Sequence, residues 1–223
     1  METKIKEMFL ALGADACGIA GIEKFENSPK GFHPTDIYKD CKSVIVFIRR
    51  LPKGLLHVSS RIVYLNANNM ALAELDRIGL AACDALEAMG GTAVPLPCDS
   101  PYEYWDSERL EGRGLLSMRH AALSAGLGSM GKNTLIINKT FGNMVNIGAL
   151  LTDLALESDP PAEDLCRKEC QICLKACPSK ALSNAAVNQK LCRQHTYTTN
   201  GRGFEVCNCN RCRILCPLAL GTL

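Results

Sequence analysis

The sequence predicts an α+β protein in which a layered α/β region is followed by a small cysteine-rich region. Helical and strand-like patterns alternate up to residue 157, as in proteins that stack helices on a sheet. Residues 43–48 form a continuous apolar run, which is typical of a strand buried on both faces. Nine of the 13 cysteines lie between Cys166 and Cys216, so we expect thiols to organise the second region.

The boundary between the two regions is expected at the acidic, proline-containing stretch 157–161. The predicted domains are therefore residues 1–158 and residues 159–223. In the first domain, helices are expected at 5–12, 66–89 and 115–125, and strands at 15–20, 43–48, 92–96 and 134–138. A last apolar segment covers 145–156, and the polar and aromatic residues 98–113 are expected to form a long loop.

Three basic residues, Arg49, Arg50 and Lys53, follow the 43–48 strand. Two interpretations stay open for them. They are either a solvated loop end or a site for the tail of an anionic cofactor.

The cysteines follow the pattern of the bacterial two-cluster ferredoxins. Cys173 precedes Cys177-Pro178, and Cys212 precedes Cys216-Pro217, so each run of closely spaced thiols ends in a Cys-Pro pair. In such runs the fourth cysteine binds the cluster of the other run. The sequence therefore predicts two [4Fe–4S] clusters that share both segments.

Two other uses of these thiols compete with iron–sulfur clusters. A disulfide framework is disfavoured because nothing in the chain indicates export. Structural zinc stays open, although nine cysteines with two Cys-Pro endings exceed what one zinc ion needs. The candidate metal ligands are Cys166, Cys170, Cys173, Cys177, Cys192, Cys207, Cys209, Cys212 and Cys216.

The composition predicts a cytoplasmic protein. A formal net charge of +2 gives no global basic field for binding nucleic acid. Met1–Leu12 lacks the apolar core of a signal peptide. No apolar run approaches the ~18 residues that a membrane span needs, so no membrane association is expected.

A glycine loop covers Gly126-Leu-Gly-Ser-Met-Gly131 and matches the dinucleotide-binding pattern; with Lys132 it nearly matches a P-loop. Both motifs need a strand before them and a helix after them. Here a predicted helix precedes and a predicted strand follows, so we expect the loop to let backbone approach a large flat group. The candidate cofactor-binding residues are Gly126, Leu127, Gly128, Gly131, Lys132, Asn133 and Thr134.

Several stretches together resemble the epoxyqueuosine reductase family, which is related to the reductive dehalogenases. They are residues 12–20, 41–46, 125–138 and 147–154, together with the double cysteine region. The resemblance implies a nitroreductase-like N-terminal domain that binds a corrinoid (cobalamin), with FMN as the less favoured cofactor. It also implies a ferredoxin-like C-terminal domain whose two [4Fe–4S] clusters pass low-potential electrons to the cobalt.

The resemblance further implies how the ligands are divided. One cluster takes Cys166, Cys170, Cys173 and Cys216, and the other takes Cys177, Cys192, Cys209 and Cys212. Cys207 is then left over and competes with Cys192 for one place.

Two departures from the family bear on the substrate. Members that act on tRNA carry a helical-repeat extension after the clusters, whereas this sequence ends at Leu223. They also carry an acidic proton donor before a Gly-Pro turn, and the nearest carboxylate here is Glu111. Glu111 is therefore the candidate catalytic residue, and tRNA is not expected as a substrate.

We expect an iron–sulfur oxidoreductase that takes electrons from a ferredoxin or flavodoxin and passes them to a corrinoid. The corrinoid would then reduce a small-molecule or corrinoid substrate. Three alternatives stay open: a corrinoid-handling protein with no organic substrate, a minimal epoxyqueuosine reductase, and a plain ferredoxin-like electron carrier. The oligomeric state also stays open, with a homodimer as one alternative.

Overall fold

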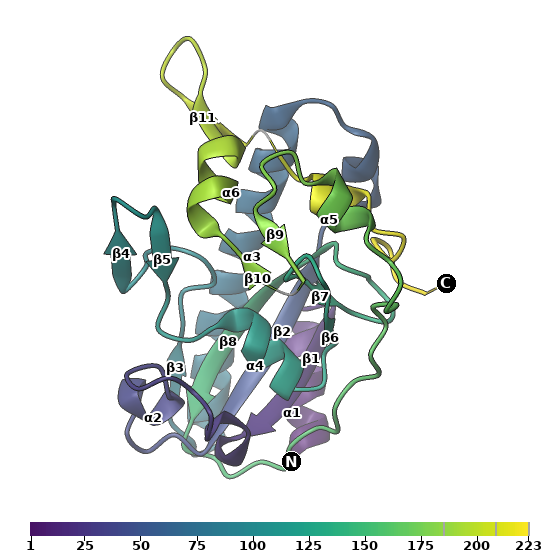
Figure 1. Ribbon diagram of the computed structural model, residues 1–223. Coiled ribbons are helices and arrows are strands. Elements are labelled where there is room, and N and C mark those ends of the chain that lie inside the picture. Colours follow the sequence, from purple (N-terminus) through teal and green to yellow (C-terminus); the bar gives the residue numbers. More distant parts are fainter. Residues whose placement is uncertain (185, 208, 223) are drawn as a thin grey trace.

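A four-stranded sheet forms the centre of the computed structural model, which describes residues 1–184, 186–207 and 209–222 (Figure 1). The strands lie in the order β1 (Ala16–Gly21), β2 (Ser43–Arg50), β8 (Val145–Thr152) and β3 (Ala93–Pro95). Every neighbouring pair is antiparallel. The expected combination of helices and strands is confirmed.

The two inner strands, β2 and β8, are buried along almost their whole length. Alternate residues of β2 enter different cores: Ile45 and Phe47 face one side of the sheet, and Val46 faces the other. Antiparallel sheets often leave one face in water, but here both faces are covered. The strand predicted at 43–48 is therefore confirmed, and so is its burial on both faces.

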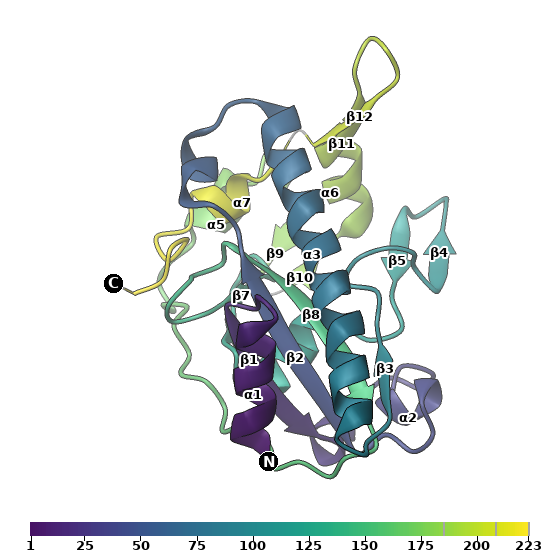
Figure 2. The ribbon, with the colours of Figure 1, turned by 180° about the vertical axis from the view of Figure 1, so that it is seen from behind.

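Helices cover both faces of the sheet. Figure 2 shows α1 (Glu2–Ala11) and α3 (Arg61–Ala88) side by side on one face, where the Phe9 and Phe47 rings lie 4.9 Å apart. The opposite face carries α4 (Met118–Ser124). Helix α3 begins before the predicted residue 66, because the Ser60 hydroxyl accepts a hydrogen bond from the Val63 amide and caps the helix.

The segment 98–113 contains a β-hairpin, so the prediction of a plain loop was wrong. Strand β4 (Tyr104–Asp106) pairs antiparallel with β5 (Glu111–Arg113). Each strand has three residues and little burial, so the sequence carries no alternating apolar pattern there. The hairpin projects from the body of the molecule (Figure 1).

The remaining elements are short. In the first region they are η1 (Ile22–Phe25), α2 (Pro34–Ile37), η2 (Lys53–His57), β6 (Ser129–Met130) and β7 (Ile136–Ile137). In the cysteine region they are α5 (Ile172–Ala176), β9 (Leu182–Ser183), β10 (Ala186–Val187), α6 (Gln189–Thr196), β11 (Tyr197–Thr199), β12 (Glu205–Cys207) and α7 (Arg211–Ile214). None of the helices in the described part of the chain combines the length and apolar character needed to cross a membrane.

The segment 157–161, where a domain boundary is predicted, runs along the open edge of β1 (Figure 1). The Ile19 amide donates to the Asp159 carboxylate at 2.8 Å, and the Asp159 amide donates to the Ile19 carbonyl at 2.9 Å. The Gly21 amide donates to the Ser158 hydroxyl at 2.7 Å. The linker thereby satisfies backbone groups that an edge strand would otherwise expose.

Candidate functional site

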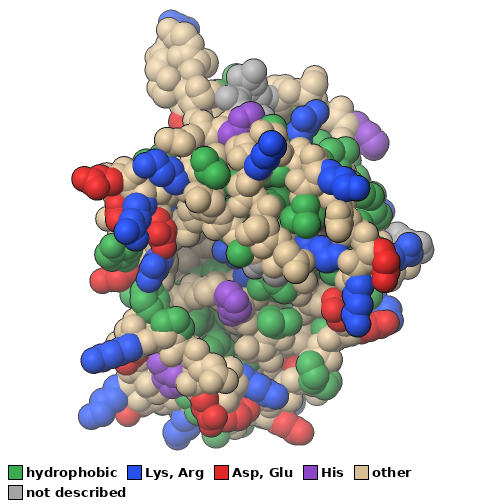
Figure 3. Space-filling model, viewed as in Figure 1, with side chains coloured by type: hydrophobic (Ala, Val, Ile, Leu, Met, Phe, Trp, Pro, Cys, Tyr) green, Lys and Arg blue, Asp and Glu red, His purple; other side chains and the backbone are tan. Residues whose placement is uncertain are grey.

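A cavity of about 1020 Å³ lies between α4, the β4–β5 hairpin and the cysteine region, and it opens on the face shown in Figure 3. This volume is at the upper end of typical ligand sites, which span ~300–1,000 Å³. The lining comes from segments far apart in the sequence: 24–32, 96–102, 112–124, 133–135, 182–197 and Cys212. The cavity is therefore a product of the tertiary fold and can hold a large cofactor.

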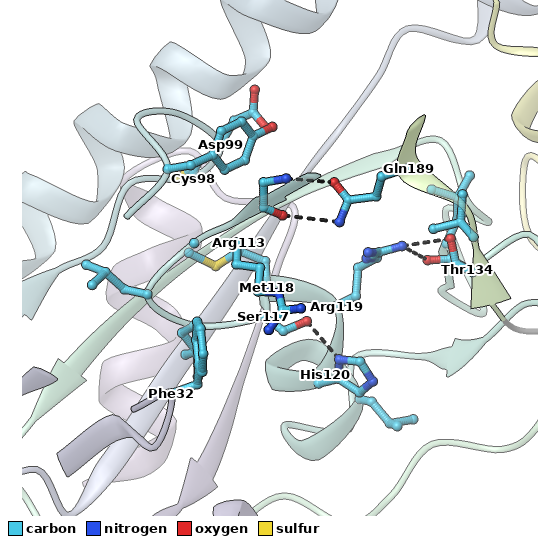
Figure 4. A pocket seen from close by; sticks show the side chains of 18 of the residues that line it. Phe32, Cys98, Asp99, Arg113, Ser117, Met118, Arg119, His120, Thr134 and Gln189 are labelled. Atoms are coloured by element: carbon cyan, nitrogen blue, oxygen red, sulfur yellow. Dashed lines mark hydrogen bonds between the residues drawn. The ribbon is translucent and has the colours of Figure 1, made fainter. Parts of the chain in front are cut away.

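Two polar pairs from α4 stand at the cavity wall (Figure 4). Arg119 Nη1 donates to both the carbonyl and the hydroxyl of Thr134, at 2.8 and 2.7 Å. Burial lowers the pKa of the Arg119 guanidinium. His120 Nδ1 lies 2.7 Å from the Ser117 hydroxyl. Thr134 was among the predicted cofactor-binding residues, whereas Ser117, Arg119 and His120 were missed because their pattern resembles no known motif.

Helix α6 fixes the β4–β5 hairpin to the cavity wall. The Gln189 amide exchanges two hydrogen bonds of 3.1 Å with the backbone of Gly112 (Figure 4). The Arg193 guanidinium lies 5.1 Å from the Tyr102 ring centre and 5.0 Å from the Trp105 ring centre, within cation–π range. The helix that carries Cys192 therefore also positions one side of the cavity.

The cysteines of the second region fall into two groups, and within each group the thiols shift one another's pKa. Burial raises the pKa of the Cys216 thiol, and the thiolates of its neighbours raise it further. The first thiol group consists of Cys216 with these neighbours, Cys166, Cys170 and Cys173. Burial raises the pKa of Cys212 to about 11, and neighbouring thiolates again contribute. The second thiol group consists of Cys212 with these neighbours, Cys177, Cys192 and Cys209.

These groups contain the same cysteines as the two sets that the resemblance implies, and the assignment of cluster ligands stays a prediction. Within the described residues, no group of three or more His, Cys, Asp or Glu side chains is arranged to hold a single metal ion. Hydrogen bonds also surround the thiols. Although burial opposes it, the pKa of Cys177 is lowered by bonds from the Ser179 hydroxyl and from backbone amides, including Ala181 N–H at 3.3 Å. Such bonds stabilise negative charge on sulfur.

Cys207 lies beside the second thiol group but is held differently. Its thiol donates to the Cys209 carbonyl at 3.6 Å, and its pKa is raised mainly by burial. The Cys209 and Cys192 thiolates raise its pKa further. Cys207 is therefore a neighbour of the second thiol group, and the choice between Cys207 and Cys192 as cluster ligand stays a prediction.

The glycine loop has the predicted helix-to-strand context, since α4 precedes it and β7 follows it. Its glycines, however, face the protein itself. A Cβ on Gly126 would lie 2.3 Å from the Pro160 carbonyl oxygen, and one on Gly128 would lie 2.5 Å from that of Ile137. A Cβ on Gly131 would lie 2.5 Å from the Asn133 amide oxygen. Close backbone approach is thus real, but it brings together parts of this chain.

The other predicted loop residues divide between the core, the cysteine region and the cavity. Leu127 is buried in the core. The Lys132 ammonium donates to the carbonyls of residues 167, 168 and 170, which lie around the first thiol group. Asn133 donates to the Cys212 carbonyl at 2.7 Å, and Asn133 and Thr134 line the cavity. The loop therefore connects α4 to both thiol groups.

Glu111 does not lie in the cavity wall as the structure describes it. Its carboxylate pairs with Arg113 of the same strand at 2.9 Å, so it is already engaged by a neighbouring cation. Arg49 and Arg50, in turn, both pair with Asp15, which agrees with a solvated loop end for these two residues.

Comparison with known proteins confirms the resemblance predicted from the motifs. No family model matches the chain. An epoxyqueuosine reductase from Listeria monocytogenes is 35% identical over 120 residues, which cover 48% of this chain and 31% of that protein. One from Bacillus subtilis is 32% identical over 132 residues, which cover 55% and 34%. The match spans about a third of the length of these curated relatives.

Solved structures share the fold. An epoxyqueuosine reductase solved with an epoxyqueuosine-modified tRNA-Tyr stem loop has a TM-score of 0.65 at 19% identity, covering 98% of this chain and 65% of its own. A reductive dehalogenase whose structure suggests a mechanism for B12-dependent dehalogenation has a TM-score of 0.67 at 18% identity, covering 86% and 28%. The tRNA stem loop is bound by the first of these neighbours, whereas tRNA was not expected as a substrate of this chain.

Proposed function

We propose that this chain is a cytoplasmic iron–sulfur oxidoreductase that delivers electrons through two [4Fe–4S] clusters to a corrinoid held in the large cavity. The observation that carries the proposal is the position of Cys192 and Cys212. Both belong to the second thiol group, and both line the cavity. A cluster on these thiols would adjoin whatever the cavity binds, so electrons would have a short path to it.

The residues present fit the proposed groups. Each thiol group supplies four sulfur donors, the set that a cubane cluster takes, and soft thiolates favour iron–sulfur clusters. In this interpretation residues 159–223 form the ferredoxin-like domain, and residues 1–158 form a nitroreductase-like domain that carries most of the cavity. A bound corrinoid would supply a strongly reducing metal centre for reductive cleavage.

The chain itself would bind and orient the cofactor and supply a proton. The hairpin clamped by Gln189 and Arg193 would shield one side of the cofactor from water. His120, with Nδ1 near the Ser117 hydroxyl, is placed at the cavity wall, and its Nε2 could exchange a proton with a bound substrate. We propose His120 for this role, because Glu111 is engaged with Arg113.

The substrate has two candidates. A small molecule or a corrinoid protein was expected from the sequence. The similarity to curated epoxyqueuosine reductases favours a second candidate, reduction of epoxyqueuosine in tRNA. In either case a ferredoxin or flavodoxin would act as the electron donor.

The test is anaerobic purification followed by iron, sulfide and zinc analysis and by calorimetric titration with cobalamin. About eight irons with matching sulfide, and binding of one corrinoid, support the proposal. Stoichiometric zinc without sulfide contradicts the clusters, and tight FMN binding without corrinoid binding contradicts the cofactor. Turnover of epoxyqueuosine-containing tRNA with a strong reductant then distinguishes the two substrate candidates, with a His120→Gln variant as the inactive control.

A further inference from the structure

Arg119 is a half-buried cation with no acidic partner in the described part of the chain. None of the ion pairs found there involves it. Withdrawing a guanidinium from water without a counter-charge is costly, and burial accordingly lowers the pKa of Arg119. A half-buried arginine at the wall of a large cavity therefore indicates that the missing negative charge comes from a ligand.

The hydrogen bonds of Arg119 leave most of its donors for such a ligand. Both bonds to Thr134 come from Nη1. A guanidinium carries five N–H groups in a planar fork, and Nε and Nη2 make no hydrogen bond to the described residues. This fork matches the geometry of a phosphate, which it can bind through two parallel hydrogen bonds.

The charges around Arg119 favour an anion as well. The basic side chains of the cavity wall are Lys24, Arg113, Arg119, His120 and Arg193, against the single carboxylate of Asp99. Two of these are already engaged: Arg113 pairs with Glu111, and Arg193 lies against two aromatic rings. Of the other three, Arg119 is half-buried, whereas Lys24 and His120 are exposed.

We propose that Arg119 is an anion-binding residue that takes the phosphate group of the cofactor in this cavity. The inference rests on the proposed function, since cobalamin carries a phosphate in its nucleotide loop. FMN, the alternative cofactor, also carries one. Thr134 adjoins Asn133, which holds the Cys212 carbonyl at 2.7 Å. The phosphate would therefore lie at the wall that leads to the second thiol group.

The experiment compares ligands with a phosphate and related ligands without one. Calorimetry on the anaerobic, cluster-loaded protein would use cobalamin against cobinamide, which lacks the nucleotide loop, and FMN against riboflavin. In Arg119→Met, we expect the phosphate-bearing ligand to bind on the order of 10- to 100-fold more weakly, with a change below about threefold for its phosphate-free partner. Arg77→Met is the control, because Arg77 pairs with Glu74 on the surface of α3.

Arg119→Lys keeps a charge and a donor for Thr134 but loses the fork, so we expect a smaller loss confined to the same ligand. This variant decides the matter if Arg119→Met does not retain its clusters. Equal weakening of cobalamin and cobinamide, or no weakening of either, overturns the role of Arg119 and leaves the proposed function standing. Failure of wild-type protein to bind either cofactor overturns the proposed function itself.

Discussion

The sheet region and the cysteine region are held together by different forces. The sheet region buries apolar side chains on both faces of β2 and β8, and Phe9, Phe47, Leu75 and Ile78 are among those with almost no exposure. Among the described residues after Pro161, the buried apolar side chains are Cys173, Ala181, Val206 and Ala219. A segment with so small a core needs another source of stability, and a metal cluster is one such source.

Polar contacts join the two regions. Arg213 on α7 follows Cys212 directly and donates to the carbonyls of Asn143 and Val145 at 2.7 and 3.1 Å. Lys132 and Asn133 reach from the glycine loop to carbonyls beside the thiol groups. The sheet region therefore has its own apolar core and positions the cysteine region through polar contacts. Clusters would supply the stability that the cysteine region lacks.

Removal of the clusters should produce the largest difference in stability between the two regions. We expect chelation or oxidation to unfold the cysteine region while the sheet persists, because thiol–metal binding supplies folding free energy there. Hydrogen exchange should show loss of protection after residue 161 and retained protection in β2 and β8. Uniform loss of protection in both regions would show that they fold as one unit.

The next largest effect is expected for Cys192→Ala. Cys192 is among the thiols that raise the pKa of Cys212, so its loss should remove one cluster and leave about four irons per chain. Cys207→Ala is the matched control and should keep about eight irons. The opposite result would exchange the roles of the two cysteines.

Phe47→Ala tests how much the apolar core stabilises the sheet region. Phe47 is fully buried, and its ring lies 4.9 Å from that of Phe9, so the substitution should lower the free energy of unfolding of the sheet region by ~3–5 kcal/mol. Urea denaturation monitored by circular dichroism measures this change. Leu80→Ala, at a side chain that is 60% exposed, should change stability little. A similar loss in both variants would contradict the assigned core.

The smallest effect is expected for Lys132→Met. The substitution removes the ammonium that holds three carbonyls around the first thiol group. We expect iron to leave that cluster about tenfold faster, with the second cluster unaffected. Lys139→Met, which removes an exposed pair with Glu163, is the control. Equal rates in the two variants would mean that Lys132 does not support the cluster loop.

The sequence predicted the elements whose residues are close together in the chain. The apolar runs of β2 and β8 and the α4–loop–β7 order follow from periodicity and composition. The placement of β8 between β2 and β3 does not, because strand pairing joins residues distant in sequence. The β4–β5 hairpin was missed for the same reason, since part of its support comes from Gln189 on α6.

The candidate site likewise has features that the sequence predicted and features that depend on segments distant in the chain. The thiol spacing predicted two clusters, because a short cysteine motif carries its geometry locally. The division of the ligands between the clusters came from the family resemblance and stays a prediction. The glycines were assigned to a cofactor, whereas their close neighbours are Pro160, Ile137 and Asn133 of this chain. Arg119 and Arg193 could not be found from sequence, since their roles depend on a cavity assembled from distant segments.

The most direct test of the central claim is electron paramagnetic resonance of reduced protein with one equivalent of cob(II)alamin. The second thiol group adjoins the cavity, so we predict magnetic coupling between one cluster and the cobalt. That coupling should be absent in Cys192→Ala and present in Cys207→Ala. Iron–sulfur and cobalt signals that remain independent in the wild-type protein would contradict electron delivery from this cluster to a corrinoid in the cavity.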